Sequence, residues 1–156
     1  HYSIDHVSYI IDKLRACKDD PFIACDIIAG LPGEDDDDFM KSYDFIEQHR
    51  FSALHVFPYS PRPNTSLYGS PLKVEERVRD ERAERLRKLS AELNAEYVAR
   101  QLGKSVEILA EGRDASEGTT GNYLKARILN ISGRALSEGG LYKGTITSLS
   151  PLEVSV

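Results

Sequence analysis

Apolar residues recur at helical spacing in three segments of the chain. The first segment, residues 3–18, opens with Ser3, a suitable N-cap, and has apolar residues at Ile4, Val7, Ile10, Ile11 and Leu14. The same spacing predicts a second helix over residues 35–49 and a long, exposed amphipathic helix over residues 74–101. These segments predict three helices in the first two thirds of the chain.

Two apolar runs alternate with these helices. Residues 22–28 are an almost continuous run of strand-forming residues, which predicts a strand buried on both faces of a parallel sheet. Residues 52–57 form a second such run directly after the second helix. This order predicts a strand-helix-strand unit with parallel strands and a right-handed crossover.

The pattern changes after Gly103 to short strands separated by glycine. Strands are expected over residues 105–110, 123–129, 141–147 and 152–156. This spacing is typical of a small antiparallel β-barrel or sandwich. The fold class that we predict is therefore an α/β part, residues 1–102, followed by a small antiparallel β-barrel, residues 103–156.

Composition narrows the function classes. The chain has 156 residues, a net charge of −5 and a pI near 5.4, which argues against a strongly basic nucleic-acid binder. No apolar run approaches the roughly 20 residues that span a membrane, and we expect a cytoplasmic protein. Two cysteines eight residues apart indicate reduced, buried thiols. Because the sole methionine is Met40, we expect a piece of a longer protein.

Two loops have the composition of ligand-binding segments. Residues 30–33 read Gly-Leu-Pro-Gly directly after a strand, and glycine lets the backbone approach a ligand closely while Pro32 stiffens the turn. Residues 58–71 hold four prolines and follow the carboxyl end of the next strand, where parallel sheets place ligands. Within this loop Arg62 can pair a phosphate or carboxylate, although a simple connecting loop is an equal interpretation.

The acidic run over residues 34–38 stands at a predicted helix start. Carboxylates there accept hydrogen bonds from free N–H groups and are favoured by the helix dipole. Magnesium and calcium sites place their carboxylates at alternating loop positions instead. We interpret the run as helix capping, with Glu34 as the one residue that has a further candidate role.

Residues 26–34, which read DIIAGLPGE, and residues 54–65, which read LHVFPYSPRPNT, together resemble the radical S-adenosylmethionine methylthiotransferases. These enzymes add a methylthio group to an adenosine of tRNA. The broader superfamily pattern GxIxGxxE is met only in part, because Asp26 replaces its first glycine and the acid falls one place late. Residues 54–60 are most similar to the branch that modifies N6-threonylcarbamoyladenosine next to the anticodon.

The resemblance implies that residues 1–102 are the carboxyl-terminal part of a radical S-adenosylmethionine barrel. It implies S-adenosylmethionine and two 4Fe-4S clusters as cofactors of the full-length enzyme. With two cysteines and no CxxxCxxC loop, this chain alone is expected to be inactive and to hold no metal ligand or catalytic residue. The residues implied to contact S-adenosylmethionine are Ile28, Gly30, Pro32, Gly33, Glu34 and Phe57.

From Gly103 onward the chain resembles the TRAM domain, an OB-like barrel that binds tRNA. The resemblance makes tRNA the expected partner, with Tyr123 available to stack on a base. Six acidic residues balance six basic ones in this part, so scattered solubilising charges are the competing interpretation. The residues assigned to tRNA are Tyr59, Arg62, Lys104, Arg113, Tyr123, Lys125, Arg127 and Lys143.

Other functions stay open on the sequence. Residues 103–156 are compatible with a stand-alone RNA-binding or interaction module, and the first part with another radical S-adenosylmethionine enzyme, such as a ribosomal-protein methylthiotransferase. A barrel cut before its final strands would leave residues 22–28 and 54–57 uncovered. We therefore expect the chain to self-associate through this sheet.

Overall fold

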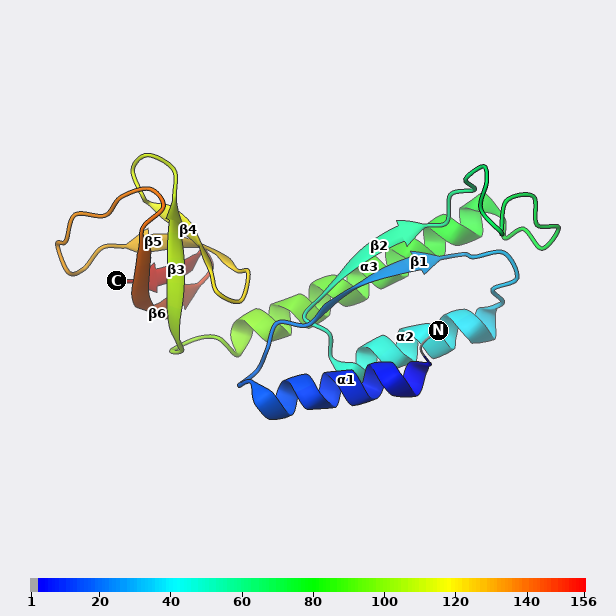
Figure 1. Cartoon of the computed structure of the whole chain (residues 1–156), viewed down its shortest axis with the longest axis horizontal. Coiled ribbons are helices and arrows are strands. Elements are labelled where there is room, and N and C mark those ends of the chain that lie inside the picture. Colours follow the sequence, from blue (N-terminus) through cyan, green and yellow to red (C-terminus); the bar gives the residue numbers. More distant parts are fainter. Residues whose placement is uncertain (1–2) are drawn as a thin grey trace. The chain divides into compact units, whose positions relative to one another are not determined.

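The structure, a computed structural model, describes residues 3–156. The chain forms two compact units, one ending at Ala95 and the other spanning Glu96–Val156. Each unit has its own hydrophobic core. The first unit is built from α1, α2, most of α3, β1 and β2, and the second contains a small β-barrel (Figure 1). The predicted boundary near Leu102 falls inside the second unit.

The helices of the first unit are those expected, within a few residues at each end. They are α1 (Ile4–Cys17), α2 (Asp36–His49) and α3 (Glu76–Ala99). Ser3 caps α1 by accepting the His6 N–H, and Asp35 caps α2 by accepting the Asp38 N–H at 2.8 Å. The interpretation of the acidic run as helix capping is therefore confirmed.

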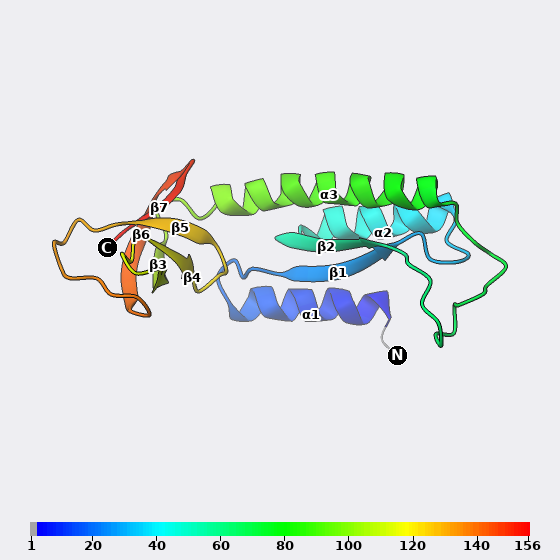
Figure 2. The ribbon, with the colours of Figure 1, turned by 90° about the horizontal axis from the view of Figure 1, so that it is seen from above.

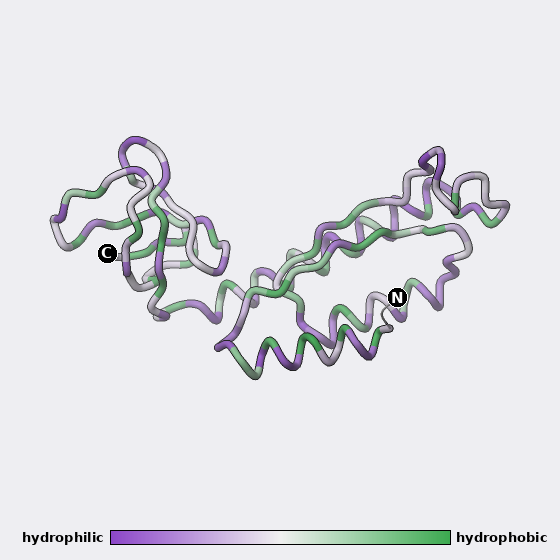
Figure 3. Tube along the Cα trace, in the orientation of Figure 1, coloured by the Kyte–Doolittle hydropathy of each residue, from purple (hydrophilic) through white to green (hydrophobic). Residues whose placement is uncertain are grey.

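The two strands of the first unit, β1 (Ala24–Ala29) and β2 (Ala53–Pro58), pair in parallel as predicted. Burial alternates along both, and Ile28 is 48% exposed. The prediction that residues 22–28 are buried on both faces is wrong, because the helices cover only one face of this two-stranded sheet. Figure 3 shows that both strands are nonetheless largely hydrophobic.

The core of the first unit lies between the sheet and the helices. Side chains of all three helices and both strands join in this core, and Figure 2 shows the helices running along the strands. Three leucines of α3, one or nearly one turn apart, are buried there: Leu86, Leu89 and Leu93. Burying each such side chain contributes roughly 1.5–3 kcal/mol, so packing rather than intrinsic propensity holds this charged helix in place.

The second unit contains a closed barrel with strand order β3-β4-β5-β7-β6. The strands are β3 (Ser105–Glu111), β4 (Glu117–Thr120), β5 (Lys125–Leu129), β6 (Leu141–Leu149) and β7 (Leu152–Ser155). Four pairs are antiparallel, but β5 and β7 are parallel. The barrel is therefore mixed, and the prediction of a purely antiparallel barrel is wrong.

Neither the β4 strand nor the parallel pair was predicted from the sequence, and each has its own physical reason. The β4 strand reads Glu-Gly-Thr-Thr, which has no alternating apolar pattern for a sequence argument to detect. β5 and β7 are parallel because the chain reverses direction twice between them, once before β6 and once after it. At Gly118 in β4 an added Cβ would lie 2.4 Å from the Leu109 carbonyl oxygen, so only glycine fits there.

The end of α3 packs within the second unit. Tyr97 is buried, and its hydroxyl accepts a hydrogen bond of 2.9 Å from the Asn122 side chain, which also donates to Gln101 at 3.2 Å. The barrel interior is filled by Ile108, Ile146 and Val154. No helix within residues 3–156 is both long and apolar enough to cross a lipid bilayer.

Candidate functional site

A cavity of about 550 Å³ lies at the carboxyl ends of β1 and β2. This volume falls in the range of roughly 300–1,000 Å³ that is usual for small-molecule sites. Apolar side chains form most of the wall, and hydroxyl groups and one guanidinium group form the rest. The lining residues are Ile28, Leu31, Phe57, Pro58, Tyr59, Ser60, Arg62, Thr65, Ser66 and Leu67.

The floor of this cavity is made by one pair of residues from neighbouring strands. Ile28 of β1 stands in register with Phe57 of β2, so the parallel pairing brings these two side chains to the same face. They are 48% and 52% exposed, on the sheet face opposite the core. An aliphatic and an aromatic side chain held on a rigid sheet offer a flat surface to an apolar or aromatic ligand.

The outer wall is the proline-rich loop, which is tied to the sheet and to itself. The Tyr59 N–H donates to the Ala29 carbonyl at 2.8 Å, which fixes the loop to the end of β1. The Thr65 hydroxyl donates to the Arg62 carbonyl at 2.8 Å. Asn64 between them has φ 66°, a left-handed conformation that asparagine tolerates. Arg62 is exposed at this wall, where it can pair an anion.

The glycine turn contributes one side chain to the cavity, that of Leu31. Gly30 and Gly33 have φ values of 77° and 90°, which glycine adopts without strain. The Gly33 N–H donates to the Leu72 carbonyl at 2.8 Å. Pro32 lies against a separate cavity of about 50 Å³. Of the residues assigned to S-adenosylmethionine, the cavity thus brings together Ile28 and Phe57, and it does not include Gly30, Pro32, Gly33 or Glu34.

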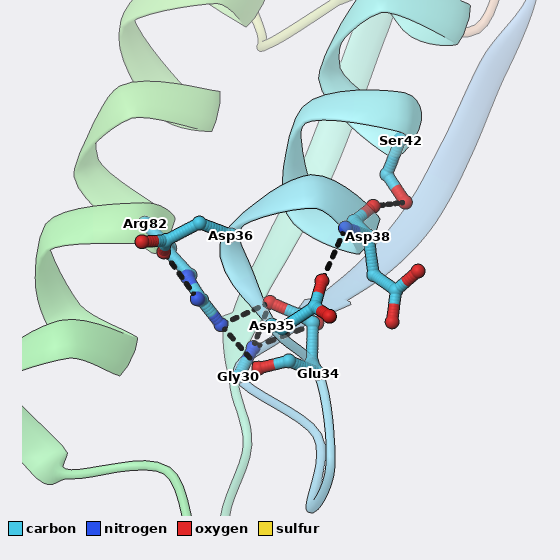
Figure 4. Close-up of polar contacts among 7 residues, drawn as sticks. All are labelled: Gly30, Glu34, Asp35, Asp36, Asp38, Ser42 and Arg82. Carbon is cyan, nitrogen blue, oxygen red and sulfur yellow. Dashed lines mark hydrogen bonds and ion pairs between the residues drawn. The ribbon is translucent and has the colours of Figure 1, made fainter.

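Glu34 instead faces α3. Both of its carboxylate oxygens accept the Gly30 N–H at 3.1 Å, and Oε1 accepts Arg82 Nη1 at 2.8 Å (Figure 4). The side chains of Arg82 and Glu34 are only 7% and 15% exposed. Arg82 Nη2 also pairs with Asp36 at 2.7 Å. Arg82 was not identified from the sequence, because it is one of many arginines in a charged helix.

The groups that line the cavity are chemically compatible with S-adenosylmethionine as a ligand. This ligand combines a flat adenine with hydroxyl, ammonium and carboxylate groups. Ile28, Leu31 and Phe57 supply apolar contact, while the hydroxyl groups of Ser60 and Thr65 and the guanidinium of Arg62 supply polar partners. The residues present therefore fit one side of such a ligand.

The two cysteines differ in environment. Cys17 is exposed at the end of α1, whereas Cys25 lies in β1 on the side that faces the core. Burial, with the neighbouring Asp26 charge, raises the Cys25 pKa to about 11, so this thiol stays protonated at neutral pH. Within residues 3–156 no group of histidine, cysteine or acidic side chains is arranged to hold a metal ion.

The basic residues assigned to tRNA in the barrel lie among carboxylates. Lys125 forms an ion pair with Glu111 at 2.6 Å, and hydrogen bonds from Lys125 and Thr119 lower the pKa of Glu111. Arg127 stands in register between Glu117 of β4 and Glu153 of β7. The barrel exterior around β5 therefore alternates in charge and does not form a continuous basic surface.

The remaining residues assigned to tRNA are spread around the barrel. Lys143 of β6 stands opposite Glu107 of β3, and Arg113 is exposed in the loop after β3. Lys104 precedes β3. Tyr123, 78% exposed in the β4–β5 turn, has a ring accessible for stacking. Tyr59 and Arg62, also assigned to tRNA, line the cavity of the first unit.

Comparison with known proteins relates most of the chain to tRNA-modifying enzymes, although no protein-family model matches it. The chain is 36% identical over 131 residues to the threonylcarbamoyladenosine tRNA methylthiotransferase MtaB of Bacillus subtilis, which covers 80% of this chain and 29% of the relative. It is 40% identical over 122 residues to a tRNA-2-methylthio-N(6)-dimethylallyladenosine synthase of Thermoanaerobacter sp., a match that covers 76% of this chain and 26% of the relative. The MtaB protein of Treponema pallidum is 31% identical over 138 residues, which cover 88% of this chain and 28% of that protein.

These matches span less than a third of each relative's length but most of this chain. No more than about a quarter of this chain lies outside either of these two matches. The chain thus belongs, as a homologue of part of their length, to the family of tRNA methylthiotransferases.

Proposed function

We propose that this chain is part of a longer tRNA methylthiotransferase, and that its substrate is N6-threonylcarbamoyladenosine in tRNA. The observation that carries the proposal is the similarity to the MtaB protein of Bacillus subtilis over 80% of the chain. The sequence LHVFPYS of residues 54–60, which contributes Phe57 and Tyr59 to the cavity, supports the choice of this branch.

In this proposal the cavity is one wall of the S-adenosylmethionine site. Ile28 and Phe57 would contact the apolar part of the ligand, and Arg62 would pair with its carboxylate or with a tRNA phosphate. S-adenosylmethionine would supply the radical chemistry, with iron–sulfur clusters bound elsewhere in the protein. The contribution of this chain is to orient the ligand on a rigid sheet and to exclude water from the Ile28–Phe57 surface.

The barrel would hold tRNA in the same proposal. Its alternating charges favour a few local phosphate contacts over a broad basic surface, so binding should depend only weakly on salt. The exposed ring of Tyr123 would add stacking on an unpaired base. A tRNA substrate agrees with the cytoplasmic location expected from the sequence.

A second candidate substrate is N6-dimethylallyladenosine in tRNA. It is favoured by one observation, the 40% identity over 122 residues to a tRNA-2-methylthio-N(6)-dimethylallyladenosine synthase. Both candidates share the cavity and the cofactor, and differ only in the adenosine that is modified.

A reconstitution experiment decides between the two substrates. The complete gene product that contains this chain is loaded anaerobically with iron and sulfide and incubated with S-adenosylmethionine and tRNA carrying one or the other modified adenosine. Mass spectrometry of the digested nucleosides should show the methylthio group on N6-threonylcarbamoyladenosine. A product only from the dimethylallyl substrate selects the second candidate, and no methylthio product from either tRNA contradicts the proposal.

A further inference from the structure

Helix α3 carries two arginines three residues apart, and each contacts the loop that follows a different strand. Arg82 donates to the Glu34 carbonyl at 3.0 Å and to the Glu34 carboxylate at 2.8 Å, after β1. Arg79 donates through Nη1 to the Tyr59 carbonyl, after β2. Residues at this spacing share one face of a helix, so one rigid element is bonded to both loops.

The Arg82 contact acts on the backbone of the glycine turn through Glu34. The Glu34 carboxylate accepts the Gly30 N–H with both oxygens, so the turn is closed by its own acidic end (Figure 4). A carboxylate bound on one side by a backbone N–H and on the other by a buried guanidinium has little freedom to move. Leu31, which lines the large cavity, lies inside this closed turn.

Arg79 contacts the same turn with its aliphatic stem. A Cβ on Gly30 would lie 2.2 Å from Cγ of Arg79, so the stem packs directly on the glycine backbone. The guanidinium of the same side chain binds the Tyr59 carbonyl. Tyr59 is also a lining residue of the cavity. Gly30 is therefore required by the closeness of α3 as well as by its positive φ.

The two guanidinium groups are held by their terminal nitrogens. Within residues 3–156 the buried side-chain nitrogens that lack a hydrogen-bond partner are Nε of Arg79 and Nε of Arg82. A buried ion pair is by itself weak evidence for added stability, because desolvation opposes the attraction. The geometry instead fixes where Leu31 and Tyr59 stand relative to each other across the cavity.

We propose that Arg82 and Arg79 are positioning residues that set the width of the ligand cavity without contacting the ligand. Arg82 fixes the Gly30–Glu34 turn, Arg79 fixes the start of the proline-rich loop, and the rigidity of α3 couples them. The inference rests on the proposed function in taking S-adenosylmethionine as the ligand of this cavity. It adds that affinity for this ligand is controlled from a helix on the opposite side of the turn.

The test uses the complete gene product and the substitution Arg82→Lys. Lysine keeps the charge, but a single ammonium group cannot bridge Glu34 and Asp36 as the guanidinium does. Loss of one buried charge-assisted bond should raise the KM for S-adenosylmethionine about tenfold, with kcat within about twofold. Arg82→Ala should raise KM further, so that lysine rescues in part.

Two matched variants separate positioning from general stability. Arg85→Lys changes the next position on the same helix face, where the guanidinium lies over the rings of Phe39 and Tyr43 and contacts neither loop, so KM should not change. Glu34→Gln, which keeps the shape of the side chain but loses the charge, should raise KM as Arg82→Lys does. A variant that lowers only the melting temperature, with KM unchanged, overturns the proposal.

A second measurement is independent of activity. Hydrogen exchange of the ligand-free protein should be faster at the Gly30 and Tyr59 amides, which donate to Glu34 and Ala29, in Arg82→Lys than in the unmodified protein, and unchanged in Arg85→Lys. If the unmodified protein has no methylthiotransferase activity, the proposed function fails while this exchange difference still supports the positioning role. If exchange at both residues is the same in all variants, the positioning role is wrong whatever the activity.

Discussion

The two units of the chain differ in whether the edges of their strands are paired. The β1–β2 sheet has two strands, each with one unpaired edge, and helices cover only one of its faces. In the barrel every strand pairs with two neighbours, so no edge is left. The open sheet presents Ile28 and Phe57 side by side on one face, whereas the barrel exterior around β5 presents paired charges. The ligand surface that we propose therefore lies on the open two-stranded sheet.

Charges also serve different purposes in the two units. The Arg82–Glu34 pair is buried and bonded to the backbone of a turn, so it fixes local geometry. The Lys125–Glu111 pair is exposed, and such pairs typically contribute between 0 and about 1 kcal/mol. Removing a charge should therefore alter the geometry of the glycine turn in the first unit and only the surface potential in the second.

The largest expected effect concerns the independence of the two cores. Ile146 is buried in the barrel, and Ile146→Ala should destabilise that unit by about 2–5 kcal/mol through lost contacts and a cavity. Hydrogen exchange measured in increasing urea should report earlier opening of β3–β7 peptides. Peptides from β1 and β2 should open at the same urea concentration as before, and equal destabilisation of both sets would refute the independence of the two units.

Part of the fold could be predicted from local sequence. The helices and the parallel strand pair followed from apolar spacing, and Ser3 and Asp35 cap helices where their side-chain chemistry predicts it. The β4 strand and the parallel β5–β7 pair did not, because both depend on which strands meet after the chain has closed. The one-sided burial of β1 depends likewise on how many strands are present.

The candidate site, like the fold, could be predicted only in part from the sequence. Ile28, Phe57, Tyr59 and Arg62 meet in one cavity because strand ends in a parallel sheet converge. The contact of Glu34 with Arg82 joins residues far apart in the sequence, and no spacing rule indicates it. The charges around Arg127 were visible in the composition, but their alternation required the strand register.

The second prediction compares the two cysteines. With a Cys25 pKa raised by burial to about 11, its thiolate fraction at pH 8 is about a hundredfold below that of a thiol at the ordinary 9.0. Alkylation followed by mass spectrometry should label exposed Cys17 first, with Cys17→Ser isolating the slow reaction. Because the folded state retains the Cys25 proton, stability should be complete below pH 9 and fall as pH rises toward 11. Equal alkylation rates of Cys17 and Cys25 at pH 8 would show that Cys25 in β1 is not buried.

The third prediction uses the open sheet face. We expect this chain, expressed alone, to self-associate through the surface around Ile28 and Phe57, and the change Phe57→Ser to weaken association about tenfold by removing an exposed aromatic ring. Leu141→Ser on the barrel is the matched control, since Leu141 is also exposed but lies on a closed barrel. Light scattering at several concentrations measures the effect. A monomer at every concentration would remove the proposed self-association.

The smallest expected effect is on the affinity of the barrel for tRNA. Glu111→Gln removes the carboxylate that pairs with Lys125, and should strengthen tRNA binding about twofold by leaving one more cation for phosphate. Lys125→Ala should weaken it by a similar factor. Filter binding at two salt concentrations measures both, and Lys41→Ala in α2 serves as a control outside the barrel. If neither barrel variant changes binding, β5 does not contact tRNA.

The most direct test of the central claim, that the cavity on the open sheet is the ligand site, is hydrogen exchange of the complete gene product with and without S-adenosylmethionine. The ligand should slow exchange in peptides that cover residues 28–34 and 57–67, where the cavity lining lies, and leave β3–β6 peptides unchanged. Protection confined to the barrel, or no protection in either loop at saturating ligand, would contradict the account.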